Sequence, residues 1–395
     1  MKKIGCVIAY RKGQNNYGTS LQGYAMLKKI QQMGYSVDVI NYEKLLGVKD
    51  KFLYVLNAIR CGEKAKLFKN SQKEKFYNSI PEYKKIVLER TAAVNAYKEK
   101  KLIPMFRTYR GFKNLSKGSL NYDAVVVGSD QVWTPLSLPN KFYNLLFVTD
   151  SVRKIAYASS FGVSDIPKFQ KKATGEYLDR FYKIGVREER GKEIVEELSH
   201  QTAEVVADPT LLLTREEWEQ EVGEIISEST LANINEAERA PYIFCYFLGR
   251  NSESWQAALR LQKRTGLRII AVRHMDEYVD EFASFGDVAP AAMDPNDFVR
   301  YIAKAKYVCT DSFHCTVFST IFHKQCMTFY RFAKNSMTGR NSRIDSLFNV
   351  LKISRDHIYD GDIDKIDSSI DWKCVDEKLS ELRKRSVEFL RNSLG

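Results

Sequence analysis

The chain has 395 residues, which is too many for one ordinary domain and indicates two domains of about 150–200 residues each. Hydrophobic residues make up 44% of the chain, which excludes a largely disordered protein. The first apolar run, residues 4–10, is too short for a signal-peptide core, and no stretch approaches the ~20 apolar residues of a membrane span. We therefore expect a cytoplasmic protein.

The net charge of +12 arises from one part of the chain. Residues 44–117 contain 19 Lys and Arg against 6 Asp and Glu, an excess of 13, so the remainder carries about −1. This distribution indicates a local basic surface rather than a generally basic protein.

Seven cysteines are scattered along the chain without a C-x-x-C pair, and no histidine lies at ligand spacing from a cysteine pair. The pattern predicts free, mostly buried thiols and no metal site.

The chain opens with a strand–loop–helix–strand pattern. We expect a strand at residues 3–10, then a polar loop, a helix at 20–33 and a second strand at 36–41. This order is typical of the start of a Rossmann-like sheet.

The basic segment 44–118 has aromatic residues among its lysines and no evident strand pattern, so we interpret it as a helical insertion in the first domain. The sheet is then expected to resume. Its predicted strands, each closed by small or polar residues, are 124–127, 154–158, 183–187 and 204–207.

A second series of strands and helices follows an acidic helical linker. The pattern predicts a first Rossmann-like domain at 1–213, the linker at 214–240, a second Rossmann-like domain at 241–374 and a C-terminal helix at 375–395. Two Rossmann-like domains facing a cleft resemble the GT-B architecture, in which ligands bind between the domains.

The loop before the first helix is the first candidate site. Asn16, Tyr17 and Gly18 precede a helix N-terminus, where backbone N–H groups favour an anion. The alternative is a plain turn whose helix is capped by Thr19 or Ser20.

A second candidate follows the strand at 124–127. Asp130 could accept a proton from a sugar hydroxyl, and its neighbours Gln131 and Trp133 are a common sugar-facing pair; Ser129 belongs to the same set. Alternatively, Asp130 only caps the next turn.

Arg187, at the end of the strand at 183–187, could hold a carboxylate or phosphate with two hydrogen bonds. A salt bridge to Glu188 or Glu189 is the alternative interpretation.

The strongest candidate joins a buried strand to a helix at residues 309–316. Ser312, His314 and Thr316 are expected at a helix N-terminus that faces the cleft, where an imidazole can bind phosphate or transfer a proton. Beyond it, three arginines suit an anionic ligand, although one or two could be surface charges: Arg331, Arg340 and Arg343.

Seven short motifs occur in this chain in the order found in the polysaccharide pyruvyl transferase family, which the chain resembles over about residues 1–350. They begin with Asn15–Gly18 followed by Leu21–Ala25 and continue with Val127–Trp133, Tyr157–Gly162, Val186–Glu188, Asp208–Leu211, Thr310–His314 and Asn341–Ile344.

The resemblance implies a GT-B-like fold and transfer of pyruvate from phosphoenolpyruvate to a sugar of a surface polysaccharide or its lipid-linked precursor, with formation of a cyclic ketal. It implies no metal and no cofactor, with phosphoenolpyruvate as the donor substrate. By position, Asp130 corresponds to a base or acceptor-orienting acid, Arg187 to a donor-binding arginine, and His314 to the histidine that meets the donor phosphate or acts as the acid. Better-known members have Arg-x-His where this chain has Ser312-Phe-His314, and another arginine is expected to replace that charge.

Other functions are compatible with the pattern. A GT-B glycosyltransferase using a nucleotide sugar is the alternative enzyme. Nucleic-acid binding through segment 44–118 is disfavoured because the aromatics there suit a helix interior. The same segment could instead meet anionic lipid headgroups, with the protein peripheral at the inner face of the membrane.

Overall fold

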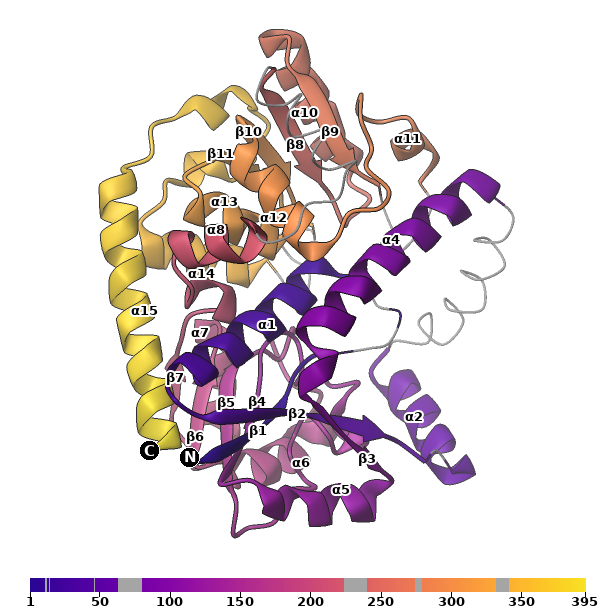
Figure 1. Ribbon diagram of the computed structural model, residues 1–395, viewed down its shortest axis with the longest axis vertical. Helices are drawn as coiled ribbons and strands as arrows, with labels where there is room; N and C mark the ends of the chain where they lie inside the picture. The colour runs from indigo at the N-terminus through magenta and orange to yellow at the C-terminus, as the bar shows by residue number, and fades with distance from the viewer. Residues whose placement is uncertain are drawn as a thin grey trace.

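A computed structural model describes residues 1–10, 13, 15–45, 47–62, 80–223, 240–273, 279–331 and 341–395. These residues form two α/β domains, each built on a parallel sheet (Figure 1). Among them, no helix is both long and apolar enough to cross a bilayer.

The first sheet has seven parallel strands in the order β3-β2-β1-β4-β5-β6-β7. Its strand order reverses direction beside β1, so the carboxyl ends of β1 and β4 meet at a switch point, where open α/β sheets bind ligands. The strands are β1 (Lys3–Val7), β2 (Ser36–Glu43), β3 (Phe106–Arg110), β4 (Ala124–Val127), β5 (Arg153–Ser159), β6 (Lys183–Val186) and β7 (Ala203–Val205).

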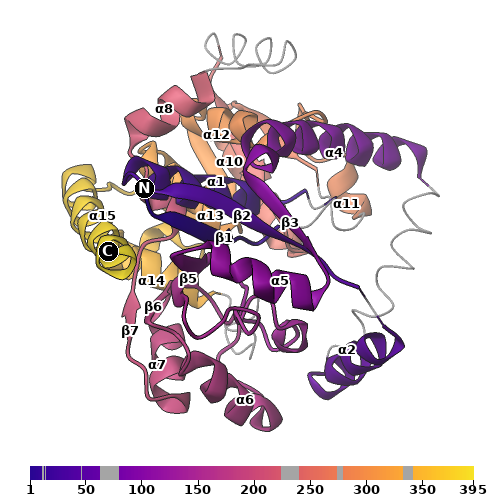
Figure 2. The same ribbon diagram turned by 60° about the horizontal axis from the view of Figure 1, so that its bottom comes forward.

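Helices lie on both faces of this sheet (Figure 2). The helices of this part of the chain are α1 (Tyr17–Gln32), α2 (Val48–Arg60), α4 (Pro81–Lys101), α5 (Phe112–Gly118), α6 (Lys168–Leu178) and α7 (Glu189–Leu198). The next helix, α8 (Arg215–Gly223), packs against the second domain through Trp218 and Phe318.

The second sheet has four parallel strands in the order β11-β10-β8-β9. Its elements are β8 (Tyr242–Tyr246), α10 (Ser252–Thr265), β9 (Arg268–Val272), α11 (Asp280–Ala283), α12 (Pro295–Lys304), β10 (Tyr307–Thr310), α13 (Phe313–Ile321), β11 (Gln325–Thr328), α14 (Ser342–Leu351) and α15 (Trp372–Leu394). The predicted fold class, two Rossmann-like domains, is confirmed.

Two helices connect the domains on opposite sides of the molecule, α4 and α15 (Figure 1). The C-terminal helix α15 packs back on the first domain, where the Ser386 hydroxyl accepts a hydrogen bond from Ala207 N (2.8 Å) and Phe389 contacts Tyr157. On the other side, the fully buried Arg90 of α4 donates to backbone carbonyls of the second domain, including Arg273 O (2.8 Å). The domains therefore share packed contacts on both sides of the cleft.

Several strand ends differ from the sequence-based expectation by one to three residues, as in β1, which ends at Val7 rather than at residue 10, and two differences are larger. Segment 44–118 is not helical throughout, because β3 lies within it and forms the edge of the first sheet beside β2. Arg107, Thr108 and Arg110 of this strand are exposed, as suits an edge strand that pairs with only one neighbour. Helix α1 begins at Tyr17 rather than Ser20, because the Asn16 side chain caps it by accepting from Thr19 N (3.1 Å).

Candidate active site

Three ionisable side chains meet at the carboxyl edge of the first sheet. Asp130 follows β4, Arg187 follows β6, and Asp208 follows β7. Arg187 Nη1 lies 3.0 Å from Asp208 Oδ2, and its Nη2 lies 3.6 Å from Asp130 Oδ1. The side chains of Arg187 and Asp208 are 2% and 0% exposed, whereas that of Asp130 is 21% exposed. The cluster is therefore buried on the Asp208 side and opens to solvent at Asp130.

The backbone holds Asp130 in an unusual conformation. Its φ is +76°, which L residues rarely adopt, and such strain tends to occur at functional sites. Thr19 of α1 donates a hydrogen bond to Asp130 Oδ2 (3.0 Å). Burial acts to raise the pKa of Asp130, but the charges of Arg187 and the other nearby cations and the Thr19 hydrogen bond outweigh it and lower the pKa. Asp130 is therefore an ionised carboxylate at neutral pH and can accept a proton.

The second domain reaches this cluster through the N-terminus of α13. Ser312 caps that helix by accepting a hydrogen bond from Cys315 N, and His314 lies in its first turn. His314 Nε2 is 3.6 Å from Asp208 Oδ2. Burial acts to raise the pKa of Asp208, but His314 and Arg187 reverse this effect and hold it well below its usual value. Asp208 thus links the imidazole of one domain to the guanidinium of the other.

Gly18 of α1 leaves the room that His314 occupies. A Cβ atom on Gly18 would lie 2.1 Å from His314 Nδ1, far closer than two such atoms can approach. The N-termini of α1 and α13 are therefore in direct contact across the domain boundary, and only glycine permits this contact at position 18.

Two arginines flank Phe313 at the same place. The guanidinium carbons of Arg187 and Arg343 lie 5.0 and 5.5 Å from the centre of the Phe313 ring. Burial, with the neighbouring charge of Arg187, lowers the pKa of Arg343 to about 9, which still leaves it protonated at neutral pH. These arginines, Asp208 and Phe313 line a recess of about 350 Å³. Two adjacent cations at a recess are suited to an anion with two negatively charged groups.

The remaining arginines differ in position. Arg331 lies beside Asp311, to whose backbone oxygen its Nη2 donates (3.1 Å), and its charge contributes to lowering the pKa of Arg343. Arg340 falls outside the described residues.

Two other residues of the predicted site lie near Asp130. Ser129 is fully buried, and its hydroxyl donates to Ala158 O (3.1 Å), which fixes the turn after β4. Gln131 is partly exposed, and its side chain lies over Gly162.

Three predicted binding residues lie elsewhere. Trp133 is in the core of the first domain, 4% exposed and packed against Phe161 with its Nε1 donating to Tyr143 O (3.0 Å). Tyr17 stacks on Phe298 of α12, with ring centres 4.8 Å apart, and is 1% exposed. The Thr316 hydroxyl donates to Ser312 O (3.2 Å) inside α13. Trp133 therefore belongs to the core of the first domain and Tyr17 to the interface between the domains. The Thr316 hydroxyl is hydrogen-bonded within its own helix.

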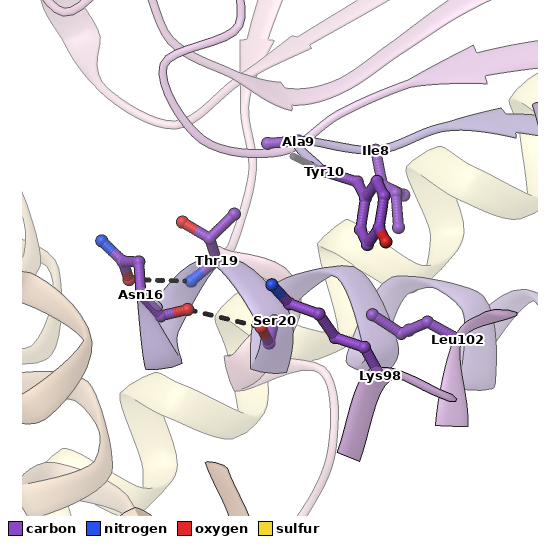
Figure 3. A pocket seen from close by; sticks show the side chains of 8 residues that line it. All are labelled: Ile8, Ala9, Tyr10, Asn16, Thr19, Ser20, Lys98 and Leu102. Carbon is purple, nitrogen blue, oxygen red and sulfur yellow. Dashed lines mark hydrogen bonds between the residues drawn. The ribbon is translucent and has the colours of Figure 1, made fainter. Parts of the chain in front are cut away.

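A second recess of about 230 Å³ lies on the other side of Thr19 (Figure 3). Asn16, Thr19 and Ser20 line it from α1, and Lys98 of α4 points its ammonium group between α1 and the loop after β1. Burial lowers the pKa of Lys98 to about 8. Because Thr19 also binds Asp130, this polar recess adjoins the ionisable cluster.

Sequence reasoning missed Asp208, Thr19 and Lys98 as site residues. Asp208 had a usable signal, since it follows a predicted strand as Asp130 does, and carboxyl ends of parallel strands meet at one edge. Lys98 had none, because one lysine among many in a basic helix looks like a surface charge. Within the described ranges, no group of three His, Cys, Asp or Glu is arranged to hold a metal ion.

The family model for polysaccharide pyruvyl transferase matches residues 16–331, which is most of the chain. The chain belongs to the polysaccharide pyruvyl transferase family. Membership makes it a transferase of polysaccharide biosynthesis. The family match includes Asp130, Arg187, Asp208 and His314, whereas Arg343 lies beyond its end.

Two solved structures are similar to this chain over nearly its whole length. UDP-N-acetylglucosamine 2-epimerase from Rickettsia bellii matches with a TM-score of 0.52 and 11% identity, covering 100% of this chain and 97% of the epimerase. UDP-GlcNAc 2-epimerase from Neisseria meningitidis, bound to UDP-GlcNAc, matches with a TM-score of 0.48 and 10% identity, covering 99% of this chain and 100% of that one. At this identity, the match to the Rickettsia bellii enzyme establishes the fold alone. No curated protein matches the chain significantly.

Proposed function

We propose that the chain transfers the pyruvyl group of phosphoenolpyruvate to two hydroxyls of one sugar, in a surface polysaccharide or its lipid-linked precursor, and forms a cyclic ketal. The observation that carries this proposal is the meeting of Asp130 and Arg187 of the first domain with His314 and Arg343 of the second, beside a recess that the two arginines line. Family membership supports the reaction class.

The donor carries a phosphate and a carboxylate, and both need cations in a site that excludes water. Arg187 and Arg343 are assigned to these two groups, since both lie beside Phe313 and line the same recess. Arg343 then supplies the positive charge that better-known family members carry two positions before the histidine, where this chain has Ser312. Asp208 holds Arg187 in place through their 3.0 Å ion pair.

The reaction requires one proton to be given and others to be removed. His314 is assigned to protonate the methylene carbon of the donor, which leaves an oxocarbenium-like centre at C2. A sugar hydroxyl adds to C2 and loses its proton to Asp130, whose lowered pKa keeps it ionised. The C2–O bond to phosphate then breaks with its electron pair on the phosphate, and a second hydroxyl closes the ring as its proton passes to the released phosphate. Return of the proton from Asp130 to His314 restores the enzyme, so that overall one donor and two hydroxyls give one ketal and inorganic phosphate.

Calorimetry with phosphoenolpyruvate and, separately, UDP tests the donor. We expect binding of phosphoenolpyruvate and weak or no binding of UDP. Tight UDP binding without phosphoenolpyruvate binding would contradict the proposal and favour a glycosyltransferase that uses a nucleotide sugar.

Turnover is tested with labelled phosphoenolpyruvate and an extract of lipid-linked oligosaccharides, by following phosphate release and the pyruvyl mass increment. His314→Gln and Asp130→Asn should each lower kcat about 10²–10⁴-fold while donor binding persists. His323→Gln is the matched control, because His323 pairs with Asp376 at the surface and should leave kcat unchanged. Wild-type kcat in both site variants would remove these residues from the mechanism.

A further inference from the structure

Helix α2 turns its apolar side chains away from the protein. Phe52, Val55, Leu56 and Ile59 are spaced by three, one and three residues and form one stripe, and they are 65%, 41%, 40% and 41% exposed. Leu53 and Tyr54, on other faces of the same helix, are 44% and 50% exposed as well. In a surface helix such a stripe normally faces the core. In both ribbon views α2 lies at the periphery of the first domain (Figures 1 and 2).

The opposite side of α2 attaches it to the domain. Ala58 is 1% exposed, and Asn57 donates to Pro135 O (3.1 Å) and accepts from Gln170 Nε2 of α6 (2.7 Å). Because a buried hydrogen-bonded amide fixes the orientation of the helix, the outward stripe is a defined feature of the fold. Contiguous exposed apolar surface of this kind marks an interaction site.

The apolar surface continues onto α6 and is bordered by cations. Arg60, at the end of α2, stacks on the exposed Phe169 of α6, with its guanidinium carbon 4.0 Å from the ring centre. Exposed lysines lie on both helices, Lys51 on α2 and Lys168 and Lys172 on α6. An apolar stripe rimmed by positive charge complements the surface of an anionic bilayer, in which the apolar side chains enter the headgroup boundary and the cations meet phosphates.

We infer that the α2 stripe, Phe52, Val55, Leu56 and Ile59, with the neighbouring Phe169, is a membrane-docking surface that binds the protein peripherally to an anionic phospholipid bilayer. This goes beyond the proposed transfer reaction and does not depend on it. Docking would place the protein at the surface where a lipid-linked sugar is found.

Flotation of the full-length protein with vesicles tests the inference without any turnover. Vesicles of phosphatidylcholine alone are compared with equimolar phosphatidylcholine and phosphatidylglycerol, at low and high salt. The wild-type protein should float with the anionic vesicles, less so at high salt, because screening weakens the attraction of exposed charges.

Two pairs of variants separate the apolar and charged contributions. Leu56→Ser with Ile59→Ser should weaken vesicle binding about tenfold or more, whereas Leu259→Ser, an equally exposed leucine on α10, should not. Lys51→Gln with Lys172→Gln should weaken binding to anionic vesicles about tenfold, whereas Lys373→Gln with Lys384→Gln on α15 should not.

Three results would overturn the inference. One is no binding of the wild-type protein to anionic vesicles. Another is equal vesicle binding by the wild type and by the Leu56→Ser, Ile59→Ser variant. The third is a wild-type dimer in sedimentation equilibrium that this variant converts to monomers with vesicle binding unchanged, since the stripe would then bind a second copy of the chain. Thermal melts by circular dichroism check that all variants are folded.

Discussion

The two domains contribute to the site in different ways. The first domain supplies side chains from the ends of β4, β6 and β7, and these pair with one another through the 3.0 Å contact of Arg187 with Asp208 and the 3.6 Å contact of Arg187 with Asp130. The second domain supplies His314 and Arg343 from the first turns of two helices, and these meet the first set only because the domains are packed together.

This difference separates the charges that are fixed by one sheet from those that depend on domain packing. Changes in the first set should alter both stability and activity, because the ion pair is buried. Changes in the second set should alter activity with little effect on stability. The substitutions below test this distinction, from the largest expected effect to the smallest.

Asp208→Asn should have the largest effect. It removes a fully buried carboxylate and leaves the buried Arg187 without its closest counter-charge, which should lower the free energy of unfolding by about 3–5 kcal/mol. It should also lower kcat/KM about 10²–10³-fold, because Arg187 and His314 both lose a positioning contact. Urea denaturation and steady-state kinetics measure the two effects. Glu381→Gln, in an exposed pair with Lys378, is the control and should change neither.

The same carboxylate predicts the acid sensitivity of the fold. The pKa of Asp208 is lowered in the folded state, so its stabilising effect is complete above the unfolded value of about 3.9 and is lost as the pH falls below it. The melting temperature of the wild type should therefore fall from pH 5 to pH 3 more steeply than that of Asp208→Asn. Parallel curves for the two proteins would mean that Asp208 is not the group responsible.

Gly18→Ala should impair activity while leaving each domain folded. The new Cβ would displace His314, and a misplacement of about 1 Å at a reacting group lowers the rate about 10²-fold. Gly23→Ala on the same helix is the matched control, because its Cβ would meet only the end of Ile8, at 3.3 Å. Equal kcat values for the two variants would show that contact between α1 and α13 is unimportant for turnover.

Arg343→Gln should raise the KM for phosphoenolpyruvate about tenfold or more and reduce kcat less, because a donor-binding cation is lost. It should also shift the acidic limb of the kcat/KM pH profile to higher pH. Arg343 helps to lower the pKa of Asp130, so its removal should raise that pKa. Arg355→Gln, in a surface pair with Asp345, serves as the comparison and should leave both unchanged. A lower kcat with unchanged KM would instead place Arg343 in the chemical step.

Trp133→Phe should have the smallest effect on activity. The indole packs in the core of the first domain, so the KM for the sugar acceptor should not change, whereas the free energy of unfolding should fall by about 1–3 kcal/mol. A raised acceptor KM in a stably folded variant would restore Trp133 to the sugar-binding site.

Much of the fold follows from local sequence patterns. The strands predicted at 124–127 and 183–187 are observed as Ala124–Val127 and Lys183–Val186, because buried parallel strands need apolar residues on both faces. Strand β3 was not predicted, since an edge strand with exposed charged residues resembles the surrounding basic helices. The start of α1 depends on which polar side chain caps the helix. Asn16, Thr19 and Ser20 are all suitable cap residues, and the sequence does not show that Asn16 is the one that accepts from the backbone.

The site was predictable where it follows from sheet geometry. Asp130 and Arg187 were identified because residues after parallel strands share one edge. The contact of Gly18 with His314 was not predictable, because it depends on how two domains pack, and no local pattern encodes that. Trp133 was misplaced because an indole beside a strand end suits a core as well as a sugar.

Arg90 limits how substrates can reach the cleft. Its guanidinium is fully buried and donates to the carbonyls of Arg273 (2.8 Å), Pro290 (3.0 Å) and Ala291 (3.4 Å), while α15 holds the domains together on the opposite side. Separating the domains would break these three hydrogen bonds together and would expose the surfaces that now bury the guanidinium, which costs free energy even though water can bind the freed groups. Entry and exit of substrates should therefore rely on small local movements of loops at the rim, with the relative orientation of the domains preserved throughout the catalytic cycle.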